Sequence, residues 1–180
     1  VPPLEPASYQ LVLKSVDKVQ LLFSQSFVIS AGFRAVYHDI PADKLCGALA
    51  SSPHPGLLKS LVALGRAKLG FFPQTIIRCI EYPWVAARMP RRMDGLRVLD
   101  MGAGVSPLPL WLARQGAQVT TVDGHDKIRV PPAQPDWNEW GYLDFGLIDH
   151  HIRSLNCLMQ DLTNAGPFDL IYSVSVIEHI

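Results

Sequence analysis

The spacing of apolar residues divides the chain into two regions. In residues 8–89, apolar side chains recur every three or four positions, which is typical of amphipathic helices. The region contains three such segments, and the second of them covers residues 57–69. A third segment covers residues 74–89, where Pro83 predicts a kink or a split into two helices. The first stripe, with Ser8 placed to cap its start, consists of Val12, Val16, Val19 and Phe23.

From Arg97 onward, the pattern changes to short apolar strands that alternate with helices. Such alternation builds a parallel sheet covered by helices, so the expected fold class is α/β, preceded by a helical N-terminal region. The expected boundary separates residues 1–93 from residues 94–180. The strands are expected at residues 97–100, 118–122, 155–159 and 168–176, and a helix at residues 108–115.

Composition narrows the classes of function. The chain has 180 residues, its 16 Lys and Arg balance its 16 Asp and Glu, and 48% of it is hydrophobic, which favours a folded domain over disorder. A neutral chain gives no support for a nucleic-acid partner, and Arg88, Arg91 and Arg92 are explained as a solvated linker. No apolar run reaches the roughly 18 residues of a spanning helix, so no membrane partner is expected. Three widely spaced cysteines favour a reducing, cytoplasmic location.

The candidate chemistry lies in residues 100–107, Asp-Met-Gly-Ala-Gly-Val-Ser-Pro. Here a strand has to end, turn sharply and lead into a helix. Gly102 and Gly104 permit that turn, and without Cβ atoms they let a ligand lie against the backbone. Ser106 is placed to cap the helix, and Pro107 suits its first turn. The segment therefore predicts a ligand-binding turn between a strand and a helix.

Two acids indicate which ligand this turn would bind. Asp100 ends the first strand, where ligands of open α/β sheets bind, and its carboxylate would repel a pyrophosphate but attract an ammonium or sulfonium group. Asp123 ends the second strand 19 residues after Gly104, the spacing at which an acid binds the hydroxyls of a ribose. Pro107 replaces the third glycine of the dinucleotide fingerprint. The combination predicts an adenosine-type ligand without a diphosphate.

Three blocks of the chain together resemble a known family. They are residues 97–106, residues 112–123, and residues 168–180 with the sequence Phe-Asp-Leu-Ile-Tyr-Ser-Val-Ser-Val-Ile-Glu-His-Ile. In this order they resemble the first, second and fourth strands of the class I S-adenosylmethionine-dependent methyltransferases, in the small-molecule branch where Glu-His follows strand four. The resemblance implies a Rossmann-like sheet of the methyltransferase type over residues 94–180, with the helical region as a preamble or lid.

The same resemblance implies roles for individual residues. The glycine turn would contact the methionine part of S-adenosylmethionine, and Asp100 would lie near its amino group. Asp123 would bind the ribose, Asp161 the adenine amino group, and Glu178 and His179 would lie near the transferring methyl. The complete cofactor-binding set is Asp100, Gly102, Ala103, Gly104, Asp123, Gly124, Asp161, Leu162, Ser173 and Val174.

The resemblance also implies the reaction. A methyl group would pass from S-adenosylmethionine to a small-molecule acceptor, leaving S-adenosylhomocysteine, and the protein would align the reactants and exclude water. His179 is the nearest candidate for a general base, and no catalytic residue is assigned. Two alternatives stay open: a binding module that has lost catalysis, and a nicotinamide-dependent oxidoreductase, against which Asp100 and Pro107 count.

No metal site is expected. His150 and His151 are adjacent, and side chains adjacent on a helix point away from each other. Neither this pair nor His125 and Asp126 has a third ligand at zinc spacing. Solvated side chains therefore explain these residues.

Two further groups are expected to serve packing. The first comprises Trp137, Trp140 and Tyr142, for which an aromatic substrate cage is the alternative. The second comprises Arg78, Glu81, Tyr82 and Trp84, for which part of a lid over the cofactor is the alternative.

The family resembled has seven strands, three of them after the Glu-His element. Only four residues follow residue 176, so the chain is expected to be the N-terminal portion of a longer protein, or to have a C-terminal part that is unobserved or missing. An uncovered fourth strand would present an apolar edge, and such edges pair with other chains. Self-association through this edge is therefore a further expectation.

Overall fold

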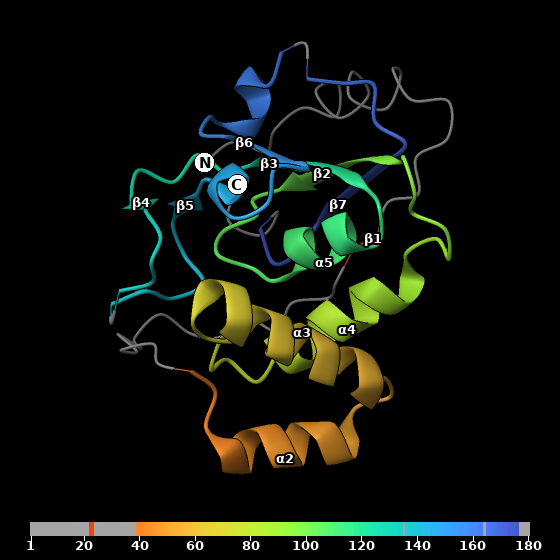
Figure 1. The fold of residues 1–180 in the computed structure, drawn as a ribbon, viewed down its shortest axis with the longest axis vertical. Coiled ribbons are helices and arrows are strands. Elements are labelled where there is room, and N and C mark those ends of the chain that lie inside the picture. The colour runs from red at the N-terminus through yellow and green to blue at the C-terminus, as the bar shows by residue number, and fades with distance from the viewer. Residues whose placement is uncertain (1–21, 24–38, 135, 164, 177–180) are drawn as a thin grey trace, which may run out of the picture.

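The computed structural model describes residues 22–23, 39–134, 136–163 and 165–176. A parallel sheet forms one layer, and helices from the first half of the chain lie against one of its faces (Figure 1). The helices are α2 (Ala42–Ser51), α3 (Pro55–Leu69), α4 (Arg78–Arg88) and α5 (Leu108–Arg114), with short 3-10 turns η1 (Phe145–Leu147) and η2 (Met159–Asp161).

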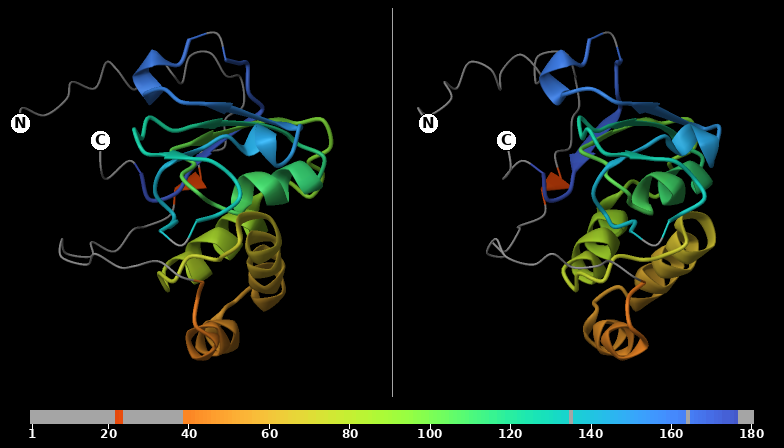
Figure 2. Two further views of the ribbon diagram at one scale, coloured as in Figure 1. Left: turned by 60° about the vertical axis from the view of Figure 1, so that its left-hand side comes forward. Right: turned by 90° about the vertical axis from the view of Figure 1, so that its left-hand side faces the viewer.

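The helical region follows the predicted pattern closely at α3. A proline in the first turn and Gly70, with φ +81°, define its two ends. Pro83 lies inside α4, which continues through it, so of the two alternatives, a kink or a split into two helices, the split is excluded. Helix α2 was not expected. It lies farthest from the sheet and contributes Ala48 as its one buried residue (Figure 2).

The main sheet has five parallel strands in the order β1-β7-β2-β3-β6. Strand β2 lies between β7 and β3, so the glycine turn that follows β2 emerges at the middle of the sheet. A separate parallel pair, β4 with β5, lies in the segment after β3. The strands are β1 (Leu22–Phe23), β2 (Arg97–Met101), β3 (Gln118–Val122), β4 (Ile128–Arg129), β5 (Tyr142–Leu143), β6 (Ile152–Leu155) and β7 (Leu170–Ser173).

Two predicted strands differ from the structure. The third strand, β6, begins three residues before the expected residues 155–159 and overlaps them at Leu155, because Ile152 pairs with Val119 and is buried. The side chain of Asn156 then turns back to the carbonyls of Asp123 and His125, with both bonds at 3.0 Å, and ends the strand. Strand β7 is shorter than the expected fourth strand, residues 168–176.

The edge of β7 is not open where the prediction placed an uncovered edge. Strand β1 pairs with it, Leu22 opposite Tyr172 and Phe23 opposite Ser173. Phe23 therefore belongs to a strand and not to the helix predicted from its spacing. Val12, Val16 and Val19 lie outside the described residues, as do Glu178 and His179.

The main hydrophobic core lies between the sheet and α3, α4 and α5. It includes Leu61 of α3, Val85 of α4 and Val98 of β2, each almost fully buried. A smaller cluster on the other face of the sheet contains Leu99, Val122 and Ile171. Helices from residues 1–93 and strands from residues 94–180 thus share one core, and the domain boundary stays a prediction. Within the described residues, no helix has the length and apolar character needed to span a bilayer.

Candidate functional site

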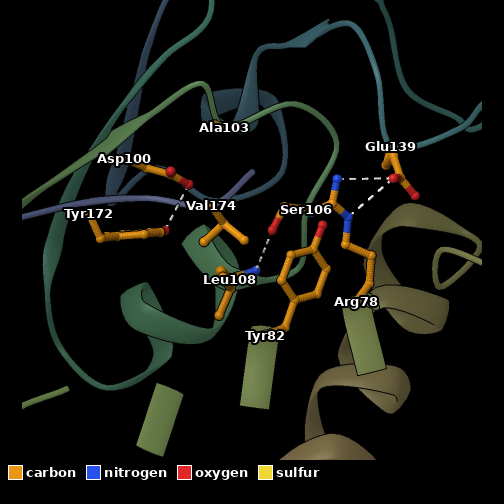
Figure 3. A pocket seen from close by; sticks show the side chains of 9 residues that line it. All are labelled: Arg78, Tyr82, Asp100, Ala103, Ser106, Leu108, Glu139, Tyr172 and Val174. Carbon is orange, nitrogen blue, oxygen red and sulfur yellow. Dashed lines mark hydrogen bonds and ion pairs between the residues drawn. The ribbon is translucent and has the colours of Figure 1, made fainter. Parts of the chain in front are cut away.

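A small cavity lies beside the glycine turn, where β2 and β7 end and α4 begins (Figure 3). Its volume of about 30 Å³ is enough for roughly two water molecules. Polar side chains from four parts of the chain converge on it. The lining residues are Arg78, Tyr82, Asp100, Ala103, Ser106, Leu108, Glu139, Tyr172 and Val174.

Asp100 is one of two buried acids that line this cavity, with Glu139. Only 3% of it is exposed, and its Oδ2 accepts a hydrogen bond of 2.7 Å from the hydroxyl of Tyr172. Burial disfavours the charged carboxylate and raises the pKa of Asp100 to about 7, although the bond from Tyr172 lowers it. The charge of Asp123 raises the pKa further, so the two predicted acids interact at neighbouring strand ends.

The turn between β2 and α5 has the predicted form. Gly102 and Gly104 both have positive φ, +72° and +53°, which L side chains rarely adopt. The Oγ of Ser106 accepts from the backbone N–H of Leu108 at 3.1 Å. Pro107 occupies the N-cap position of α5, so the prediction that Ser106 caps this helix is wrong by one residue. The turn is thus built by the residues that the sequence assigned to it.

Asp123 holds this turn in place. Its Oδ2 accepts from the N–H of Gly104 at 2.8 Å, and its Oδ1 accepts from the N–H of His125 at 2.8 Å. The carboxylate therefore joins the end of β3 to the glycine turn, while the residue stays partly exposed. Asp123 is not among the cavity-lining residues.

Protein atoms occupy the space beside three of the predicted cofactor-binding glycines. A Cβ on Gly102 would stand 2.5 Å from a methyl carbon of Val176, and one on Gly104 would meet the carbonyl oxygen of Glu139. A Cβ on Gly124 would stand 2.6 Å from the side chain of Leu158. In this structure, these glycines allow close packing between protein segments, where a ligand was expected.

The remaining predicted site residues lie in three different settings. Asp161 is exposed at the end of η2, and Leu162 packs against the small cluster on the other face of the sheet. Ser173 is buried, and its hydroxyl donates to the carbonyl of Met101 at 2.9 Å, which ties the end of β7 to β2. Of the predicted cofactor set, the cavity brings together Asp100, Ala103 and Val174.

A buried ion network connects α4 to the cavity. The Nη1 of Arg78 donates to Oε2 of Glu81 at 2.7 Å, and its Nε donates to Oε1 of Glu139 at 3.1 Å. Burial lowers the pKa of Arg78, but Tyr82 and the two neighbouring carboxylates raise it by more, so the pKa lies above its ordinary value. Burial raises the pKa of Glu139. Burial raises the pKa of Tyr82, whose hydroxyl points toward Ser106 (Figure 3).

Packing was the preferred interpretation of Arg78, Glu81, Tyr82 and Trp84, yet Arg78 and Tyr82 line the cavity. Trp84 packs instead against Arg88, whose guanidinium carbon Cζ lies 3.5 Å from the centroid of the Trp84 ring. Glu139 was not predicted. An Arg and a Glu three residues apart at a helix start would have suggested the first ion pair, but Glu139 carries no local signal.

The aromatic segment around Glu139 passes beside the glycine turn. The carbonyl of Glu139 accepts from the N–H of Val105 at 2.9 Å. The buried guanidinium of Arg129 holds the segment through the carbonyl of Trp140, at 3.1 Å. Trp137 is buried, which agrees with packing, whereas Trp140 is 56% exposed. The segment therefore supports the turn from outside.

His150 and His151 lie in a turn, so the expectation that a helix points them apart is wrong. Their ring centroids are 4.0 Å apart, and Nδ1 of His151 lies 3.0 Å from Oδ1 of Asp149. Ligand atoms of the three residues lie within 4.8 Å of one another. They lie away from the cavity residues, and the absence of a metal stays a prediction.

Comparison with known proteins points to one kind of enzyme. Ubiquinone biosynthesis O-methyltransferase of Xylella fastidiosa (strain 9a5c) is 30% identical over 110 residues, 60% of this chain and 40% of the relative. The Azorhizobium caulinodans protein of the same name is 30% identical over 126 residues, 69% of this chain and 45% of the relative. This chain is similar to O-methyltransferases. The resemblance predicted from the sequence is thereby confirmed.

A mitochondrial ubiquinone biosynthesis O-methyltransferase of Arabidopsis thaliana shows the same similarity, at 29% identity over 127 residues, 69% of this chain and 36% of the relative. The chain thus spans less than half the length of these relatives. No family model and no solved structure matches it. The Rossmann-like α/β class with a helical N-terminal region agrees with these similarities.

Proposed function

We propose that this chain is part of an S-adenosylmethionine-dependent methyltransferase that transfers a methyl group to an oxygen atom of a small acceptor. The observation that carries the proposal is the pair Asp100 and Asp123, which end neighbouring strands on either side of the glycine turn. The similarity to several O-methyltransferases supports the oxygen as the methylated atom. Their names favour a hydroxylated precursor of ubiquinone as the acceptor.

The charges around the cavity suit a positively charged ligand. Asp100 and Glu139 line it together with a single cation, Arg78, which is also paired with Glu81. A cationic group beside Asp100 would favour the ionised carboxylate and lower its pKa. Under this proposal, Asp100 binds the amino group of S-adenosylmethionine, and Asp123 accepts from the ribose hydroxyls.

The space does not suit the ligand in this conformation. A cavity of about 30 Å³ is far smaller than the pockets of roughly 300 Å³ or more that hold small molecules. Val176 also occupies the space beside Gly102. Cofactor binding at this turn therefore requires a rearrangement, and we derive no transfer step from the arrangement described here. Glu178 and His179 remain candidates for the methyl-transfer side of the site.

Calorimetric titration of the full chain with S-adenosylmethionine, S-adenosylhomocysteine and NAD⁺, followed by a transfer assay with hydroxylated quinone precursors, tests the proposal. We expect saturable binding of both sulfur ligands and methylation of the acceptor hydroxyl. Binding of both ligands without turnover on any acceptor would favour an inactive binding module. NAD⁺ binding without a response to either sulfur ligand would favour an oxidoreductase and overturn the proposal.

A further inference from the structure

The turn after β7 packs against the glycine turn at Gly102. The methyl carbons of Val176 stand 2.5 and 2.6 Å from the position of a Cβ on Gly102, so this side chain fills the space beside the glycine. Ser175 precedes it with φ +53°, the one non-glycine residue with positive φ in the described part of the chain. Such a backbone costs free energy in any residue that has a Cβ. Another interaction must therefore hold the turn in place.

Glu81 supplies that interaction from α4. The hydroxyl of Ser175 lies 2.8 Å from Oε1 and 3.0 Å from Oε2 of Glu81, to which it donates. The Glu81 side chain is 3% exposed and is itself fixed by Arg78 at 2.7 Å. Because an ionised acceptor strengthens a hydrogen bond, this contact can offset the cost of the positive φ. Helix α4 thus holds the turn after β7.

The strand before this turn is fixed independently. Ser173 donates to the carbonyl of Met101, and Tyr172 donates to Asp100. Both bonds lie before residue 174. Loss of the bond between Ser175 and Glu81 would therefore free the turn while leaving β7 attached to β2.

We propose that residues 174–176 form a latch over the cofactor site, and that Glu81 is the residue that positions it. This inference rests on the proposed function. With the latch closed, Val176 covers Gly102. With the latch open, the backbone of Gly102 becomes accessible to the methionine part of the cofactor. Binding then selects the open state, and the apparent affinity is reduced by the fraction of molecules that are closed.

Four single variants of the full chain test the latch by calorimetric titration with S-adenosylhomocysteine. Val176→Ala removes the side chain that covers Gly102, and Ser175→Ala removes the hydroxyl that binds Glu81. If about nine in ten molecules are closed, each variant tightens binding by up to about ten-fold. The matched controls are Val119→Ala, at a buried position of β3, and Ser154→Ala, whose hydroxyl bonds Thr121 and not the latch. Both controls are expected to leave the affinity unchanged.

A variant of opposite sign separates a latch from a loss of packing. Asn adopts positive φ more readily than Ser, and its amide also donates hydrogen bonds. Ser175→Asn therefore keeps the latch closed, and we expect its affinity for S-adenosylhomocysteine to equal that of the wild type or to be weaker. Tighter binding by Ser175→Asn would contradict the assigned role of Glu81.

Hydrogen exchange without ligand tests the latch separately from the function. We expect the amides of residues 174–176 to exchange faster in Ser175→Ala than in wild type or Ser154→Ala. Suppose that the wild type binds the ligand, but Ser175→Ala shows the same exchange and the same affinity as the wild type. This result overturns the latch and leaves the proposed function intact. Suppose instead that Ser175→Ala exchanges faster, but neither the wild type nor Val176→Ala binds S-adenosylmethionine or S-adenosylhomocysteine. This result overturns the proposed function and supports the latch.

Discussion

The hydroxyl of Tyr172 donates a hydrogen bond of 2.7 Å to Oδ2 of Asp100, and neither residue is more than 3% exposed. The bond joins β7 to the end of β2, immediately before the glycine turn in the chain. It places a carboxyl group that titrates near neutral pH at the centre of the candidate site, because burial raises the pKa of Asp100 to about 7. Two predictions depend on this pair.

The first prediction concerns stability and pH. In the unfolded chain Asp100 ionises near its ordinary pKa of about 4, whereas in the folded protein it stays protonated up to about 7. The folded state therefore binds more protons between these values, and Asp100 lowers stability as pH rises from about 4 to 7. Asp100→Asn keeps an acceptor for Tyr172 but does not titrate. We expect the variant to gain roughly 2–4 kcal/mol over wild type between pH 4 and pH 8.

Urea unfolding of both proteins at several pH values measures this difference. Other titrating groups are shared by the two proteins, so their contributions cancel. A difference between variant and wild type that stays constant from pH 4 to pH 8 would show that Asp100 ionises normally in the folded protein.

The second prediction removes the donor. Tyr172→Phe leaves Asp100 buried without its hydrogen bond, and that bond lowers the pKa of Asp100. We expect the pKa, followed by NMR of the Asp100 carboxyl carbon, to rise above about 7. We also expect a loss of about 1–3 kcal/mol in unfolding free energy at pH 8. Tyr142→Phe, at a half-buried tyrosine of β5, serves as the control and should leave the pKa of Asp100 unchanged.

Short-range sequence patterns correctly predicted helix α3, strands β2 and β3, and the glycine turn, because interactions between residues close in sequence determine these elements. Helix α3 has apolar periodicity and a glycine at its end, and β2 and β3 are short segments rich in aliphatic and β-branched residues. The positions of Asp100 and Asp123 at neighbouring strand ends follow directly, because parallel strands end at one edge of the sheet. The glycine turn needed no long-range information either.

The missed parts depend on contacts between distant residues. Strand β6 is fixed by pairing of Ile152 with Val119, which no local pattern contains. Glu139 reaches the site through Arg78, 61 residues earlier in the chain. The sequence correctly placed Gly104 in the turn. The carbonyl of Glu139, however, lies where a Cβ on residue 104 would stand, and this contact is visible only in the folded chain.

The third prediction compares two arginines. Arg78 is 11% exposed and paired with two buried carboxylates, Glu81 and Glu139. Removing one partner of a buried ion pair leaves uncompensated charge, so Arg78→Ala should lower the unfolding free energy by about 3–5 kcal/mol. Arg66 forms an exposed pair with Asp39, and Arg66→Ala should cost less than about 1 kcal/mol. Equal losses in urea unfolding would show that the Arg78 network is not buried as described.

The fourth prediction concerns Asp123. Under the proposed function, Asp123→Ala removes a charged acceptor from the ribose, and we expect S-adenosylhomocysteine affinity to fall by about 1.5–3 kcal/mol in calorimetric titration. The carboxylate also holds the N–H of Gly104 at 2.8 Å, so part of the loss reflects a looser turn. Asp169→Asn, in an exposed pair with Arg97, is the control for loss of one negative charge. Unchanged affinity in Asp123→Ala would remove Asp123 from the ligand site.

The fifth prediction compares the same substitution at two glycines. Gly104 has φ +53°, and a Cβ there would collide with the carbonyl of Glu139. Gly104→Ala therefore strains the turn and displaces the segment that supports it, and we expect a loss of at least about 2 kcal/mol in unfolding free energy. Gly47 lies inside α2, where a Cβ would meet no atom within 4 Å. Gly47→Ala should stabilise the protein by about 0.5–1 kcal/mol, because alanine favours helix more than glycine does. If Gly104→Ala is tolerated as well as Gly47→Ala, then the contact between Glu139 and the glycine turn does not exist in solution.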